Sequence, residues 1–136
     1  MDYEKLQGKK VGPFSFEITQ PHLERFNEVV CSSHSTQFPP TLMTIGQQGV
    51  FKLLEELKIP LSEVLHGEQE YEYGTAVPVA GDKVEYECEI KKVTVKGRTR
   101  KMVFLLFESS YRIPKSGDLI AISRSNVIHR PGEENA

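Results

Sequence analysis

The sequence has no tryptophan, only two cysteines and no apolar run of about 18 residues. A membrane-spanning helix needs about 20 consecutive apolar residues, so no membrane span is expected. Cys31 and Cys88 lie far apart in the chain, which argues against a disulfide framework and favours a reducing, cytoplasmic location. The first residues, from Met1 to Lys5, also lack the apolar stretch of a signal peptide.

Net charge is low as well. Lys and Arg number 17 and Asp and Glu number 19, giving a net charge of −2. Without an excess of positive charge, and with no tryptophan, nucleic acid is not an expected partner. The 136 residues, of which 38% are hydrophobic and 26% charged, predict one globular domain over 1–136 with a polar tail at about 131–136.

The first third of the chain predicts a strand, a short helix and a loop. Phe14, Phe16 and Ile18 alternate along residues 9–19, which is the period of a strand. Thr19 can cap the next segment and Pro21 suits a first helical turn, so a helix is expected to run to about residue 30. Small hydroxyl residues and two prolines at 31–40 then indicate a loop.

A longer helix is expected at 42–58. Its apolar stripe carries Gly46 and Gly49, although glycine in a helix costs about 1 kcal/mol relative to alanine. Two glycines on that stripe predict a neighbouring backbone at very short distance. The other side of the helix is polar, with Gln48, Lys52, Glu55 and Glu56, and Ile59-Pro60 ends it.

The remainder of the chain predicts four strands, at 64–73, 83–95, 101–113 and 119–128. The alternation in the second strand slips by one residue after Lys91-Lys92, as at a β-bulge. The unbroken apolar run Met102–Phe107 predicts a central strand covered on both faces. This order of elements indicates an α+β fold in which an antiparallel sheet wraps one long helix.

Three segments carry residue types that could take part in binding or catalysis. The loop at 31–38 places Cys31, Ser32 and Ser33 beside His34, but nucleophilic catalysis also needs an orienting acid, and none is nearby. A polar turn is the alternative. A zinc site is not indicated, because the other histidines (His22, His66 and His129) do not have ligand spacing.

The second segment is a basic hairpin, containing Lys91, Lys92, Lys96, Arg98, Arg100 and Lys101. Such a cluster can hold the phosphates of a nucleotide-bearing thioester, with Lys96 and Arg98 as candidates, or it can be a solvated hairpin. The unpaired amides that open the long helix, around Pro40 and Thr41, form a third candidate site, for an anion or a carbonyl oxygen.

Phe-Pro-Pro-Thr at 38–41, Val-Leu-His-Gly-Glu-Gln-Glu-Tyr-Glu-Tyr at 64–73 and Val-Ala-Gly-Asp at 79–82 resemble the MaoC-like dehydratase family. The likeness is closest to its N-terminal, fungal-fatty-acid-synthase-type dehydratase branch and extends from about residue 8 to 129. The resemblance implies the hotdog fold. It also implies hydration of trans-2-enoyl thioesters, or dehydration of (R)-3-hydroxyacyl thioesters, on coenzyme A or acyl carrier protein, with no metal and no further cofactor.

Active hydratases of this family carry an Asp-x-Asn-Pro-x-His motif after the first helix. Matched to it, Ser32 takes the position of the aspartate, His34 that of the asparagine and Gln37 that of the catalytic histidine. The acid–base pair is therefore missing, and the segment before Phe38 is shorter than in the family, which favours a non-catalytic subunit. His34 as a substitute base stays an alternative. The backbone amide of Thr41 matches the oxyanion donor of the family.

The leading expectation is therefore a hotdog subunit that works beside a catalytic hotdog, as a homodimer or heterodimer that binds an acyl thioester. One alternative is an acyl-coenzyme A thioesterase, for which Glu28, Glu55 and Glu56 supply carboxylates. The other is a non-enzymatic acyl-thioester binder, which needs no hidden acid.

Overall fold

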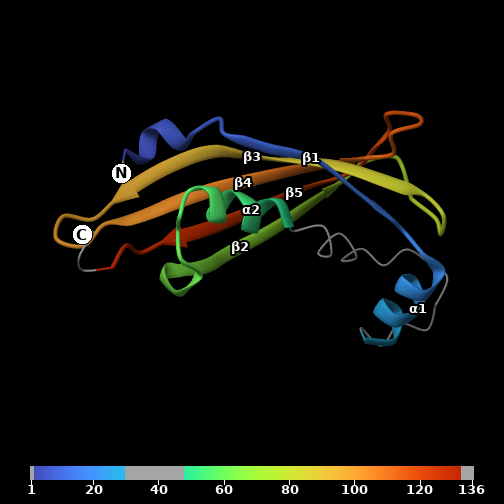
Figure 1. The fold of residues 1–136 in the computed structure, drawn as a ribbon, viewed down its shortest axis with the longest axis horizontal. Helices are drawn as coiled ribbons and strands as arrows, with labels where there is room; N and C mark the ends of the chain where they lie inside the picture. Colours follow the sequence, from blue (N-terminus) through green and yellow to red (C-terminus); the bar gives the residue numbers. More distant parts are fainter. Residues whose placement is uncertain (1, 30–47, 133–136) are drawn as a thin grey trace.

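The computed structural model describes residues 2–29 and 48–132, and its core element is one five-stranded antiparallel sheet (Figure 1). The strands lie in the order β1-β3-β4-β5-β2. The strands are β1 (Lys10–Glu17), β2 (Val64–Tyr73), β3 (Lys83–Lys96), β4 (Met102–Arg112) and β5 (Leu119–His129). The helices are η1 (Tyr3–Leu6), α1 (Gln20–Val29), α2 (Gln48–Glu56) and η3 (Leu61–Glu63), of which η1 and η3 are single 3₁₀ turns.

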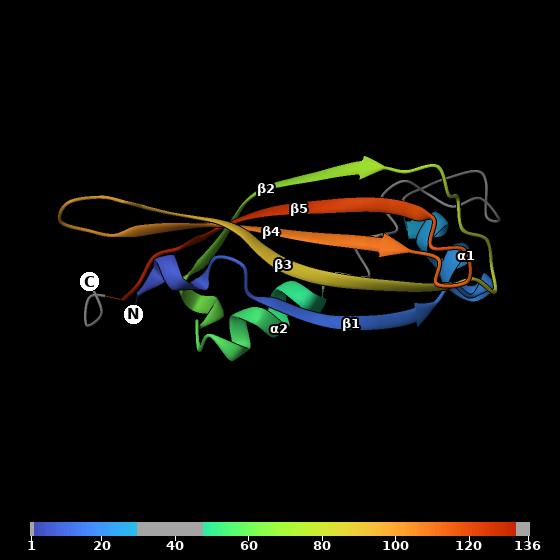
Figure 2. The same cartoon turned by 90° about the horizontal axis from the view of Figure 1, so that it is seen from above.

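Helix α2 lies across one face of the curved sheet, which is called the inner face below (Figure 2). Val50, Leu53 and Leu54 of α2 are buried against β3, β4 and β5, while Gln48, Lys52, Glu55 and Glu56 are exposed as the pattern predicted. Each fully buried leucine contributes roughly 1.5–3 kcal/mol to folding. The helix ends at Glu56, and Lys58 then takes a left-handed conformation (φ 57°) ahead of Ile59-Pro60.

Gly49 lies in close contact with the sheet, although its nearest neighbours are side-chain atoms of β3 and not the backbone that the sequence predicted. A Cβ atom added at Gly49 would lie 2.6 Å from the Cβ of Cys88 on β3, which is far inside van der Waals contact. Glycine is therefore required where α2 touches the sheet. The other glycine of the stripe, Gly46, lies outside the described residues.

Helix α1 begins at the expected place. The hydroxyl oxygen of Thr19 accepts a hydrogen bond from the backbone N–H of His22 at 3.2 Å, which is N-terminal capping. Leu23 of α1 packs with Ile18, Val84 and Tyr111 in a second buried cluster at the opposite end of the sheet from α2. The two helices therefore cover different parts of the inner face.

Strand β3 contains the predicted irregularity. Its register with β4 shifts between Ile90 and Lys92, so Ile90 and Val93 both face inward with two residues between them. Beyond the bulge, β3 and β4 form a hairpin that projects past the ends of β2 and β5 (Figure 2).

The expectation for Met102–Phe107 was half wrong. Strand β4 is central, between β3 and β5. However, burial alternates along it: Val103, Leu105 and Phe107 are buried, whereas Phe104 and Leu106 on the outer face are only half-buried. The reason is that α2 covers the inner face alone, and the described chain supplies no second layer for the outer face.

Candidate functional site

A cavity of about 390 Å³ lies between α2, η3 and the strands β2 and β5. Its walls are mostly apolar side chains, contributed by Val50, Phe51, Leu54, Leu61, Val64 and Val127. Four residues bring polar groups to it, namely His66, Gln69, Tyr71 and Ser125. An apolar cleft with a few convergent polar groups is the usual form of a small-molecule site. It is called the acyl pocket here, after the ligand that the sequence resemblance implies.

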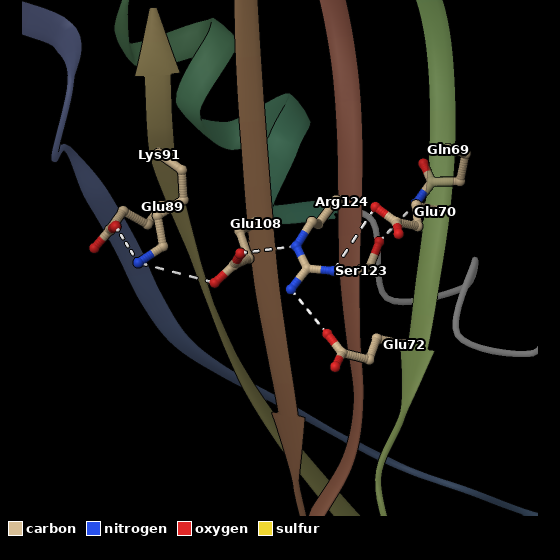
Figure 3. A network of polar contacts seen from close by, with 8 residues as sticks. All are labelled: Gln69, Glu70, Glu72, Glu89, Lys91, Glu108, Ser123 and Arg124. Atoms are coloured by element: carbon tan, nitrogen blue, oxygen red, sulfur yellow. Dashed lines mark hydrogen bonds and ion pairs between the residues drawn. The ribbon is translucent and has the colours of Figure 1, made fainter.

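Gln69 organises the polar side of the acyl pocket. Its register opposite Ser125 places it next to two inward-facing serines of β5. The Gln69 Nε2 donates to the Ser123 hydroxyl at 2.7 Å (Figure 3). The Ser125 hydroxyl donates to the Gln69 Oε1 at 2.5 Å. Both serines are buried, so these bonds satisfy groups that would otherwise be costly to bury. The cluster gives the otherwise apolar pocket one polar wall.

The described lining of the acyl pocket contains few ionisable side chains. Among its described lining residues, His66 and Tyr71 are the only ionisable side chains, and no carboxylate lines it. The thiol of Cys88, under α2, is no nucleophile, because burial raises its pKa to about 11. The described residues therefore bring one imidazole and one phenol to this pocket as ionisable groups.

The outer face of the sheet carries a network of ion pairs. Arg124 on β5 binds Glu108 at 3.1 Å and Glu72 at 2.9 Å, and the hydrogen bond to Glu72 is the main reason that the Arg124 pKa is raised (Figure 3). Lys91 extends the network to Glu89 at 3.0 Å, and this contact lowers the pKa of Glu89. The network joins β3, β4, β5 and β2 on the side away from α2 and supports the sheet.

Most of the predicted site residues lie outside the described residues, so their placement stays a prediction: Ser32, His34, Gln37, Pro40 and Thr41. Lys96 and Arg98 are described. The Lys96 ammonium lies 5.3 Å from the centre of the Phe104 ring, in a shallow outer-face groove of about 350 Å³ with Lys92 and Asn126. Arg98 is exposed in the β3–β4 turn. Neither residue lines the acyl pocket.

Sequence reasoning missed Gln69, Ser123 and Ser125. They come together only through the register of β2 on β5, which local patterns do not reveal. The one available signal was the family-like stretch at 64–73, which contains Gln69. As for metals, residues 2–29 and 48–132 contain no group of three or more His, Cys, Asp or Glu side chains able to hold an ion. In the same residues no helix is long and apolar enough to cross a membrane.

Residues 32–121 match the family described as FAS1-like, dehydratase domain region. The match spans well over half of the 136 residues. The chain belongs to this family. This match bears out the resemblance to MaoC-like dehydratases that the sequence segments indicated. No curated protein matches the sequence.

Solved structures confirm the hotdog fold. The HadBC (3R-hydroxyacyl-ACP dehydratase) complex of Mycobacterium tuberculosis is similar with a TM-score of 0.73 and 13% identity, covering 90% of this chain and 96% of that one. The ChsH1–ChsH2 complex of the same organism gives 0.65 and 12%, with 91% and 86% covered. A thioesterase superfamily member of Thermus thermophilus gives 0.58 and 17%, with 95% and 86% covered. At these identities the likeness to the three structures concerns the fold alone.

Proposed function

We propose that this MaoC-like dehydratase domain is the non-catalytic subunit of an (R)-specific enoyl-thioester hydratase or 3-hydroxyacyl-thioester dehydratase. The observation that carries the proposal is the acyl pocket, which has apolar walls and hydrogen-bonding groups but no lining carboxylate among the described residues. Adding water across a double bond needs a positioned base and acid. The motif positions that supply them in the family hold Ser32 and Gln37 in this chain.

The substrate's acyl chain would lie against Val50, Leu54 and Val127, where burial of each methylene is worth about 0.8 kcal/mol. The Gln69 amide is placed to orient a polar atom of the thioester. The oxyanion donor would be the backbone amide of Thr41, since a main-chain donor survives the loss of the catalytic side chains. No metal or further cofactor enters this proposal.

The partner would be a second hotdog subunit carrying the intact Asp-x-Asn-Pro-x-His motif, placed along the edge strand β2. HadBC and ChsH1–ChsH2 are complexes of this fold, which supports a hotdog partner. Four large apolar side chains on or beside this edge are exposed: Phe51 (55%), Leu61 (61%), Leu65 (50%) and Tyr73 (49%). The other edge strand, β1, is less suited to pairing, because Pro13 has no N–H and the strand is irregular between Val11 and Phe14.

The test has two arms. Purified alone and mixed with crotonyl-coenzyme A, the chain is expected to show no hydration above background. Copurified from its native cell, it is expected to bring down a hotdog protein with the intact motif, and that complex should hydrate crotonyl-coenzyme A. Full hydratase activity of the chain alone would contradict the proposal.

The buried free thiol of Cys88 agrees with assembly in a reducing cytoplasm.

A thioesterase is the second candidate, because thioesterases share this fold. The structure gives it less support, since Glu55 and Glu56 are exposed on the far side of α2 and Glu28 is exposed on α1. Release of free thiol from acyl-coenzyme A of several chain lengths would reveal it. A non-enzymatic binder would instead bind a non-hydrolysable acyl thioester without turnover, either alone or with its partner.

A further inference from the structure

Strand β2 forms one edge of the sheet and carries a row of glutamates on its outer face. Glu68, Glu70 and Glu72 pair with residues of β5 that alternate with its buried ones, so all three side chains face away from α2. They are exposed, with 64% of the Glu70 side chain and 59% of the Glu72 side chain accessible to solvent. These three residues are called the acidic row here.

Arg124 of β5 supplies part of the counter-charge of the acidic row. Its guanidinium lies 3.7 Å from Glu70 and 2.9 Å from Glu72, and it is shared with Glu108 on β4 (Figure 3). Strand β2 itself contains no Lys or Arg. One shared cation does not balance three carboxylates, so the outer side of this edge stays negative. A row of one sign repels a strand of the same sign and attracts a basic one.

The two ends of β2 favour pairing of this edge with another strand. Leu65 is 50% exposed near the start of the strand, and Tyr73 is 49% exposed at its end. An edge strand also presents a line of N–H and C=O groups that a further strand can satisfy. Pairing along β2 would bury both apolar side chains, one at each end of the acidic row.

A second copy of this chain matches the edge poorly. When two identical strands pair antiparallel about a two-fold axis, residues equally far from the axis stand opposite each other on the same face. An axis in the middle of the acidic row would set Glu70 against its own equivalent and Glu68 against the equivalent of Glu72. Cross-strand neighbours have Cβ atoms about 4.5–5.5 Å apart, and like charges in such positions are destabilising.

The other edge of a second copy offers no basic row either. The outward-facing residues of β1 include Lys10, Ser15 and Glu17, and the Lys10 ammonium is already 3.3 Å from Glu89 of β3. Pro13 also interrupts the line of backbone donors on this strand. The charge that complements β2 must therefore come from a different chain.

We propose that β2 pairs with the edge strand of a different hotdog subunit, whose outward-facing residues opposite the acidic row are Lys or Arg, in preference to a second copy of this chain. The inference rests on the proposed function and names the chemistry of its partner. The apolar ends of β2 supply the area that pairing buries, and the acidic row selects which chain is bound. Without that partner, the chain pairs with itself more weakly.

Sedimentation equilibrium of the full chain measures the self-association. The triple variant Glu68→Gln/Glu70→Gln/Glu72→Gln removes the repulsion between copies and should tighten self-association about tenfold, since each cross-strand charge pair contributes a factor of a few. The matched control Glu17→Gln/Glu85→Gln/Glu87→Gln removes the same number of exposed charges from β1 and β3 and should self-associate like wild type. Thermal melts of both variants check that they are folded.

Salt provides a second readout, which needs no variant. Raising NaCl from about 0.1 M to about 1 M shortens the Debye length from about 10 Å to about 3 Å. Self-association of the wild-type chain should tighten over this range, and by more than that of the triple variant. The complex with the partner copurified from the native cell should instead weaken, because its attraction is screened.

Two results would overturn the inference. One is a triple variant that self-associates no more tightly than the control variant. The other is a partner complex that salt does not weaken, or whose partner has no Lys or Arg on its edge strand.

These readouts are separable from the proposed function, because pairing is measured without turnover. A basic-edged hotdog partner that binds the triple variant about tenfold more weakly than wild type would support the inference even if the complex does not hydrate crotonyl-coenzyme A. Conversely, a hydrating complex whose dissociation constant is unchanged by the triple variant would refute the inference and leave the proposed function standing.

Discussion

At the scale of single residues, the contact between Gly49 and Cys88 sets how close α2 lies to the sheet. Gly49→Ala would place a methyl group 2.6 Å from the Cys88 Cβ, so the helix must move away from β3. Overpacking of this kind costs about 1–3 kcal/mol, despite the higher helix propensity of alanine. Urea unfolding measures the loss. Lys52→Ala, on the exposed side of the same helix, is the control and should change stability by less than about 0.5 kcal/mol.

The thiol of Cys88 predicts how stability depends on alkaline pH. Burial raises its pKa to about 11 from about 9, so between these values the unfolded chain loses this proton and the folded chain keeps it. Folding is then opposed by about 1.4 kcal/mol for each pH unit in that window, and is unaffected by this group below pH 9. Urea unfolding of wild type and Cys88→Ala at pH 7 and pH 10.5 should show the steeper decline in wild type. Parallel declines would contradict the assignment.

At the scale of elements, Arg124 joins three strands across the outer face. It lies 3.1 Å from Glu108 on β4 and 2.9 Å from Glu72 on β2. Arg124→Leu therefore removes the cation beside Glu72 and leaves Glu108 with the longer contact to Lys91, at 3.8 Å. The variant should lose about 1 kcal/mol of stability at low ionic strength, and the loss should shrink in 1 M salt because the repulsion is screened. Urea unfolding at two salt concentrations measures this loss of stability. Urea is used because guanidinium chloride is itself a salt. Lys52→Leu, whose exposed ion pair spans 3.9 Å, should show neither effect.

The elements are also the level at which the sequence was most informative. Alternating residues such as Val84, Tyr86 and Cys88 predict both strand and buried face, because a local period of two carries that information. The slip after Lys91 likewise predicted the bulge. Burial of Phe104 and Leu106 was predicted wrongly, because an apolar run does not say whether a second layer exists to cover it. The acyl pocket was not predictable, since Gln69 meets Ser125 only through long-range register.

At the scale of the whole molecule, the exposed side chains along β2 predict where a hotdog partner sits. The wild-type chain is expected to pair along β2, with a second copy when purified alone and with the catalytic subunit when copurified. Leu65→Lys/Tyr73→Lys places two charges at that edge and should abolish pairing, as seen by light scattering after gel filtration and by loss of copurification. Val95→Lys, at an exposed apolar site on the projecting hairpin, should leave pairing intact. Dissociation by Val95→Lys and not by the double variant would place the interface elsewhere.

The bulge in β3 makes the length of this strand adjustable without disturbing the core. Because the register between Ile90 and Lys92 already absorbs one surplus residue, a chain lacking Lys92 would keep Ile90, Val93 and Val95 on the inner face in plain alternation. Such a deletion would change the direction of the β3–β4 hairpin, because the bend and the extra twist that the bulge introduces would be lost. Arg100 and Lys101, which line one cavity with Arg130, would then separate from it while the fold stayed whole. Single-residue deletions and insertions at this bulge could in this way redirect the hairpin and leave the sheet beneath α2 untouched.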